Sequence, residues 1–180
     1  MPEIQIRPIE KNDLEQLAAI DHDYISDYVW QMDIRQAENS EINLQFRPIH
    51  LPRSVKVEYP RQRSHLKEDW ERRSGSLVST IQDELVAYIS LIQGLAPGVT
   101  WVTDLAVKRQ FRRQGIGSAL VLAAQAWAYQ HESYRMILEM QSKNHPAICL
   151  AQKLGFDFCG YNDRYYPNRD IALFFAKSIR

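Results

Sequence analysis

Apolar and polar positions change their spacing several times along the 180 residues of the chain. Residues 4–7 alternate in polarity as a short strand does, and Leu14 and Leu17 then follow at helical spacing. Asn12, with Glu15 three residues later, has the pattern of a capping box, which predicts that a helix begins here. We therefore expect a strand and then a helix at the start of the chain.

The segment from residue 27 to residue 73 has a less regular pattern. Strand-like runs occupy residues 28–34 and 42–49, and prolines interrupt the extended stretch that follows. Residues 61–73 are highly charged and hold two apolar side chains four positions apart, which predicts a short surface helix with a narrow buried stripe.

The second half of the chain alternates clearly between strand-like and helix-like runs. Two strand-like runs flank the polar break at residues 82–84, which has hairpin length, so these runs predict an antiparallel hairpin. A later helix is opened by Pro146 and ended by Gly155. The predicted strands are residues 77–81, 85–92, 100–107, 136–140, 156–161 and 171–175, and apolar positions 116, 120, 123 and 127 mark an earlier helix.

These runs predict an α/β fold with a mixed, mostly antiparallel sheet flanked by helices. A strand–helix–strand crossover lies in the middle of the chain, where two parallel strands are joined. The chain is 45% hydrophobic and 24% charged, and its length suits one compact domain over residues 1–180.

The composition excludes several classes of function. The 22 Lys and Arg residues balance the 22 Asp and Glu residues, so no global field favours nucleic acid or an anionic membrane. The two cysteines and five histidines lack the spacing of metal ligands, so we expect no metal. The first residues form no signal region and no apolar run approaches the roughly 20 residues that span a bilayer, which favours a soluble cytoplasmic protein.

The richest chemistry lies at residues 104–118, where a strand ends, two glycines open a helix and four cationic residues crowd the turn. Glycines let a ligand approach the backbone, and the first N–H groups of a helix have no internal acceptor. The helix dipole adds about half a positive charge there, so this junction suits a diphosphate. It is not a nucleotide-binding P-loop, because no Gly-Lys-Ser/Thr follows, nor the dinucleotide fingerprint, because Leu120 replaces the third glycine.

Two motifs in this order resemble those of the GNAT superfamily of N-acetyltransferases. The first is R-x-x-G-x-G at residues 112–117, after a strand, and the second is N-x-x-A-x-x-L-x-x-K-x-G-F at residues 144–156. The motif-bearing part is residues 61–175, with the resemblance strongest from residue 77, whereas residues 28–60 match no family pattern and form an atypical insertion or acceptor-side segment.

The resemblance implies a fold and a cofactor, acetyl-CoA, used as the acyl donor. The central sheet would be splayed between the strand ending at Val107 and the strand at residues 136–140, and the pantetheine arm would bind the backbone of Leu105, Ala106 and Val107. The pyrophosphate would bind the loop formed by Arg112, Arg113, Gln114, Gly115, Ile116, Gly117 and Ser118.

Two positions carry alternatives. Asn144 matches an asparagine near the cofactor in the family, but it also precedes a proline-started helix, so a capping role explains it equally well. The family often has a tyrosine where this chain has Ala151, placed to protonate the departing thiolate. Either the thiolate leaves without an acid, or Tyr161, Tyr165 or Tyr166 replaces that tyrosine; the alternative for these three is packing within a loop.

Transfer to an amine requires the free base. A carboxylate, or a water held by one, must therefore take a proton from an acceptor whose pKa is about 10.4 if it resembles lysine. Asp104 and Glu139 lie on the two strands that would border the splay. The alternative is that each faces solvent or pairs with an arginine. Cys149 has apolar neighbours in sequence and no adjacent His, so we expect it to pack as a small hydrophobe.

We expect transfer of an acetyl group to a primary amine of a small molecule. The carboxylates, residues 139–141 and the aromatic end at 171–175 are also loosely similar to streptothricin acetyltransferases, which modify an amine of an antibiotic. The alternatives are a protein N-terminus or lysine as acceptor, and a non-catalytic acyl-CoA sensor. A basic nucleic-acid surface around Trp70 is disfavoured by the zero net charge, and a homodimer is compatible with the sequence. We expect residues 28–60, with Trp30, Phe46 and Tyr59, to shape the acceptor pocket.

Overall fold

A computed structural model describes residues 3–36, 41–61 and 70–179. It contains a seven-stranded sheet in the order β1-β4-β5-β6-β7-β9-β8 and a separate two-stranded sheet, β2-β3. The strands are β1 (Gln5–Pro8), β2 (Tyr24–Gln36), β3 (Ile42–Val57), β4 (Gly75–Ile81), β5 (Glu84–Ile92), β6 (Val99–Val107), β7 (Arg135–Gln141), β8 (Asp157–Asn162) and β9 (Ala172–Ser178). The helices are α1 (Leu14–Ala18), α3 (Ile116–Gln130) and α4 (His145–Lys153), with short 3-10 turns η1 (Lys11–Asp13), η2 (Trp70–Arg72) and η3 (Arg109–Phe111).

The large sheet is covered by helices on both faces. Alternate residues of a strand point to opposite faces, and accordingly Leu77 of β4 joins the core beneath α3 and α4 while its neighbour Val78 joins the core beneath α1. All neighbouring strands are antiparallel except β6 and β7, which α3 connects. The predicted fold class, including the central crossover, is therefore confirmed.

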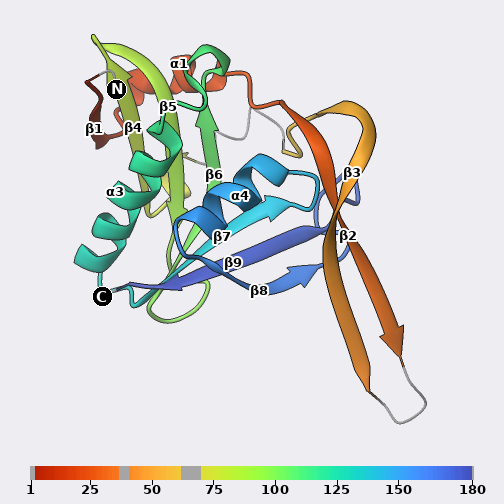
Figure 1. The fold of residues 1–180 in the computed structure, drawn as a ribbon. Helices are drawn as coiled ribbons and strands as arrows, with labels where there is room; N and C mark the ends of the chain where they lie inside the picture. Colours follow the sequence, from red (N-terminus) through yellow and green to blue (C-terminus); the bar gives the residue numbers. More distant parts are fainter. Residues whose placement is uncertain (1–2, 37–40, 62–69, 180) are drawn as a thin grey trace.

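The sheet splits where β6 and β7 leave one another. Their pairing covers only Val99 to Val102 of β6 against Arg135 to Leu138 of β7. Beyond this point β6 continues with β5 as far as Val107, and β7 continues with β9 as far as Gln141. Figure 1 shows the two strands diverging, with α4 beside the opening. The backbone of β6 beyond Val102 is thus free of strand pairing on the side that faces β7.

The β2–β3 hairpin projects from the body of the molecule (Figure 1). It contains the two predicted runs, residues 28–34 and 42–49, within longer strands. The Trp30 amide donates to the Ser142 carbonyl at 2.9 Å, and the Trp30 indole N–H donates to His145 at 3.2 Å. Phe46 packs against Phe158 at a ring distance of 5.4 Å. The hairpin is therefore attached to the sheet through α4 and β8.

Two local predictions differ from the structure. The capping box is formed by Glu10 and Asp13, not by Asn12 and Glu15. The Asp13 carboxylate also pairs with Arg7 of β1 at 2.7 Å. This ion pair holds Asp13 in place and so favours the capping box of Glu10 and Asp13 over that of Asn12 and Glu15. Of the predicted helix at residues 61–73, residues 62–69 lie outside the described part, and the end of the segment is the 3-10 turn η2.

Candidate active site

The loop between β6 and α3 has the backbone geometry of an anion site. Arg113 and Gly115 have φ values of 63° and 87°, so the chain turns sharply twice before α3 begins. Arg113, Gln114 and Gly115 are exposed to solvent. The N–H groups of the first helical turn, which includes Ile116 and Gly117, have no carbonyl of their own helix to bind. These groups can receive a phosphate anion.

The Arg112 side chain is occupied within the protein. Its guanidinium donates to the Val107 carbonyl at 2.8 Å, to the Asp23 carbonyl at 2.9 Å and to the Asp21 carbonyl at 2.6 Å. These bonds tie the loop to the connection between α1 and β2. Burial lowers the pKa of Arg112 from its ordinary value. The arginine of the motif therefore holds the loop in shape, and Arg113 is the exposed cation beside it.

Gly117, at the start of α3, lies close to side chains of β6 and α4. A Cβ built on Gly117 would lie 3.6 Å from Leu150 and 3.9 Å from Val107. A larger side chain would fill the region between the helix start, β6 and α4. Leu105, Ala106 and Val107 lie on the part of β6 that diverges from β7, where an extended arm can bind strand backbone. The predicted acetyl-CoA residues thus lie along one continuous path.

The two predicted carboxylates meet at the opening of the splay. Asp104 and Glu139 are both buried, with side chains 1% and 2% exposed. The Arg61 guanidinium lies between them: it pairs with Asp104 Oδ1 at 3.4 Å and with Glu139 Oε1 at closer range. The sequence left open whether each carboxylate takes part in proton transfer or instead faces solvent or pairs with an arginine. The structure shows pairing with an arginine, at the opening of the splay.

Each carboxylate has a different set of further partners. The Arg73 guanidinium pairs with Asp104 at 3.2 Å, and the Tyr59 hydroxyl donates to the same carboxylate. Tyr165 and Tyr166 donate their hydroxyls to Glu139 at 3.0 and 3.2 Å. Burial, reinforced by the Glu139 charge, raises the pKa of both tyrosines above the ordinary value. The two phenols therefore keep their protons at neutral pH.

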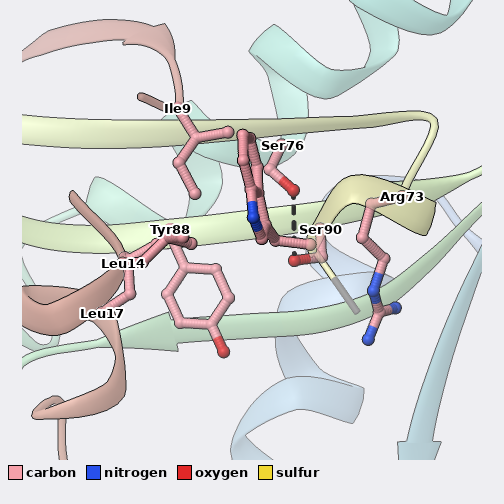
Figure 2. Close-up of a pocket in the computed structure, with 8 residues that line it drawn as sticks. Ile9, Leu14, Leu17, Arg73, Ser76, Tyr88 and Ser90 are labelled. Carbon is pink, nitrogen blue, oxygen red and sulfur yellow. Dashed lines mark hydrogen bonds between the residues drawn. The ribbon is translucent and has the colours of Figure 1, made fainter. Parts of the chain in front are cut away.

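A small pocket adjoins this cluster on the α1 side of the sheet. Figure 2 shows the Tyr88 hydroxyl and the Arg73 guanidinium pointing away from Ile9. The Tyr88 hydroxyl bonds His22 at 2.8 Å, and the His22 ring packs against Tyr59 at 4.7 Å. Burial, ahead of the Asp104 charge, raises the pKa of Tyr88. Tyr88, His22 and Tyr59 thus form a connected series of side chains that reaches Asp104 through the Tyr59 hydroxyl.

The sequence pattern does not predict that Tyr59, Arg61 and Arg73 lie beside the carboxylates. It predicts only an acceptor segment that includes Tyr59 and a charged surface that includes the two arginines. The signal that was available is the position of Tyr59 and Arg61 directly after β3, where the chain returns from the hairpin. Trp30 and Phe46, in contrast, contact α4 and β8.

Two further predictions concern α4. Asn144 caps the helix, because its side chain accepts a hydrogen bond from the Ala147 amide at 3.1 Å. Cys149 is exposed, not packed as a small hydrophobe, and its sulfur lies 3.4 Å from Nε2 of His145. The prediction for Cys149 was therefore wrong. His145 and Cys149 are four positions apart on α4, so the spacing alone predicts that the two side chains lie on the same face of the helix.

The described residues contain no group of three or more side chains arranged to hold a metal ion. No helix among them is long and apolar enough to cross a membrane.

The mixed sheet, opened beside a glycine-rich helix start, defines an acyltransferase fold in which a thioester can meet an acceptor. Comparison with known proteins gives the family: residues 40–156 match the model of the acetyltransferase (GNAT) family. The chain belongs to this family and is an acetyltransferase.

The chain is similar to known acetyltransferases of two kinds. An N-alpha-acetyltransferase of Sulfurisphaera tokodaii is 30% identical over 132 residues, which is 64% of this chain and 74% of the relative. Nourseothricin acetyltransferase has a TM-score of 0.81 at 20% identity, covering 98% of this chain and 99% of that chain. A Bacillus anthracis protein provisionally named streptothricin acetyltransferase, solved with acetyl coenzyme A, has a TM-score of 0.77 at 19% identity and covers 99% of both chains. The recognition of the family and of its fold is confirmed.

Proposed function

We propose that the whole chain is one N-acetyltransferase domain that moves the acetyl group of acetyl-CoA directly to a primary amine of a small molecule. The observation that carries this proposal is the pair of buried carboxylates, Asp104 and Glu139, at the opening of the splay. Residues 105–107 and 112–118 would hold acetyl-CoA, which supplies the acetyl group as a thioester.

The charge of the site favours an acceptor that arrives as a full cation. An aliphatic amine with a pKa of about 10.4 is almost entirely protonated at neutral pH, whereas a peptide α-amine, with a pKa of about 7.7–8.0, is partly free base. A buried carboxylate is costly unless it is paired. The two carboxylates are balanced by Arg61 and Arg73. The cluster can therefore hold an aliphatic ammonium in exchange for one of these cations, whereas a neutral amine brings no charge to replace it.

The reaction balances with the residues present. The acceptor ammonium gives one proton to Glu139, and its nitrogen then forms a bond to the acetyl carbonyl carbon. The carbon–sulfur bond breaks and the thiolate leaves with its electron pair. The nitrogen then loses its second proton to the thiolate, directly or through solvent, so that the products are the amide and the free thiol. A thiol with a pKa near 8.5 is a fair leaving group, so Ala151 in place of an acidic tyrosine is compatible with transfer. Tyr165 and Tyr166, both protonated, are the phenols nearest to this chemistry.

The test is thiol release from acetyl-CoA with a panel of polyamines, aminoglycoside-like and β-lysyl antibiotics, amino acids and N-terminal peptides. Glu139→Gln is the matched variant, because glutamine keeps an acceptor oxygen for the two tyrosines but cannot take a proton. We expect turnover on one class of small amine and a fall in kcat of about 100-fold in the variant, with acetyl-CoA affinity unchanged. Turnover confined to peptides would reject a small-molecule acceptor.

Acetylation of a protein N-terminus is the second candidate. It is supported by the N-alpha-acetyltransferase relative, which is 30% identical over 132 residues. The panel separates the two candidates directly, because product mass identifies which acceptor gained the acetyl group. Acetyl-CoA binding without thiol release on any acceptor would instead support the sensing role.

A further inference from the structure

Arg61 has the contacts of a bound organic cation. Its guanidinium pairs with both buried carboxylates and donates to the Thr103 carbonyl at 2.9 Å. Its central carbon lies 5.4 Å from the centre of the Tyr166 ring, a distance at which a cation interacts with an aromatic face. Carboxylates, a carbonyl and an aromatic face together make a site for an ammonium or guanidinium ion.

We propose that Arg61 is an internal stand-in for the acceptor: it fills the position of the acceptor ammonium and must be displaced before acetyl transfer. This inference rests on the proposed function and adds to it a residue that determines specificity. The acceptor class that follows is an aliphatic amine bound as a cation, which competes with a residue of the protein itself for Glu139.

The charges around the cluster show which carboxylate depends on Arg61. Asp104 keeps a second cation, Arg73, and a hydroxyl donor, Tyr59, when Arg61 is withdrawn. Within the described residues, the only ion pair of Glu139 is with Arg61, and its two other partners are neutral phenols. Withdrawal of Arg61 therefore leaves one uncompensated negative charge, at Glu139. A single ammonium restores the balance.

Arg61 is also the cation that can leave most easily. Its side chain is 26% exposed, against 12% for Arg73. It follows the end of β3 at Val57 and belongs to no strand or helix, so its movement breaks no backbone ladder. Arg73, in contrast, also donates to the Thr103 hydroxyl, and its neighbour Ser74 bonds β5 through the Leu91 carbonyl. The cluster thus combines one exchangeable cation with one fixed cation.

Displacement lowers the apparent affinity for every acceptor, because only the fraction of molecules with Arg61 withdrawn can bind. The test compares the wild type with Arg61→Gln, and Arg61→Lys is the second variant, which keeps the charge. We expect Arg61→Gln to lower the KM for the best amine about tenfold, and Arg61→Lys to lower it less. A thermal melt with acetyl-CoA checks that each variant is folded.

Methylguanidinium distinguishes a stand-in from a permanent clamp. In Arg61→Gln we expect it to inhibit competitively with the amine and at a concentration at least tenfold lower than in the wild type. If Arg61 is instead a clamp that orients Glu139, the KM rises in the variant and methylguanidinium restores the lost activity, which overturns the proposal.

A binding readout keeps this inference separate from the proposed function. Methylguanidinium should raise the melting temperature of Arg61→Gln and leave that of the wild type unchanged, whether or not any amine is acetylated. Equal shifts in both proteins reject the stand-in. If the shift is selective but the panel gives no product, the cation site stands and the proposed acetyl transfer to a small amine fails.

Discussion

The two halves of the candidate site are built in opposite ways. On the cofactor side, a continuous loop of about ten residues presents backbone N–H groups, and its positive charges are exposed or, at Arg112, turned inward. On the acceptor side, buried side chains from four separate segments bring two carboxylates and two guanidiniums together. The cofactor side therefore presents mainly backbone donors, whereas the acceptor side presents paired charged side chains.

This difference separates binding from selectivity. Backbone N–H groups are the same in every sequence, so a loop of fixed shape recognises one common cosubstrate while its side chains vary. A buried charge network responds strongly to each substitution, because removal of one partner leaves another buried and unpaired. Apart from the inward-turned Arg112, we expect substitutions on the cofactor side to change mainly the affinity for acetyl-CoA, and substitutions on the acceptor side to change stability and turnover.

The largest expected effect is that of Gly117→Trp. The Cβ of the new side chain would begin 3.6 Å from Leu150, so the indole would occupy the approach to the first turn of α3. Each charge-assisted hydrogen bond to phosphate contributes on the order of 1.5–3 kcal/mol, so the loss of two weakens acetyl-CoA binding by about 100-fold or more, as measured by calorimetry. Gly117→Ala, whose Cβ makes only ordinary contacts, is the control and should bind within about tenfold of wild type.

On the acceptor side, Asp104→Asn should give the largest loss of stability. It removes a carboxylate that is 1% exposed and leaves Arg73, which is 12% exposed, with a neutral partner. Breaking one side of a buried pair costs about 3–5 kcal/mol of unfolding free energy, measurable by urea denaturation at pH 7. Asp104→Asn combined with Arg73→Gln should recover part of this loss. If the stability loss of the double variant equals the sum of the losses of the two single variants, the two residues do not interact.

How far the sequence predicted each half follows from the same difference. The cofactor loop was predictable because its glycines and cations lie within fifteen consecutive positions that also end a strand and begin a helix. Local pattern also placed Asp104 and Glu139 on two strands, and the resemblance to the GNAT superfamily implied that these strands diverge. Arg61, however, meets Glu139 across 78 positions, and no local pattern states which loop will cross the opening. Pattern and spacing specify elements, whereas side-chain networks depend on the assembled fold.

The third prediction contrasts two adjacent arginines of the loop. Arg112→Gln removes bonds to the Val107, Asp21 and Asp23 carbonyls. At about 0.5–1.5 kcal/mol net for each hydrogen bond, and with part of the group exposed, it should lower the unfolding free energy by about 1–3 kcal/mol. Arg113→Gln, at an exposed position, should leave stability unchanged and weaken acetyl-CoA binding a few-fold through loss of charge. The reverse pattern in denaturation and calorimetry would mean that Arg112, not Arg113, faces the cofactor.

The smallest expected effect is that of Tyr165→Phe. Tyr165 is 42% exposed and donates a hydrogen bond to Glu139 at 3.0 Å. For a partly solvated bond of this kind we expect a loss of about 1 kcal/mol, equivalent to a fall in kcat/KM of about fivefold. Because burial and the Glu139 charge raise the pKa of Tyr165, the phenol stays protonated as pH rises to about 9, and the alkaline limb of the pH–rate profile should be the same in wild type and variant. If the alkaline limb moves in Tyr165→Phe, Tyr165 is the acid that protonates the leaving thiolate. It would then replace the tyrosine that the family often has at the position of Ala151.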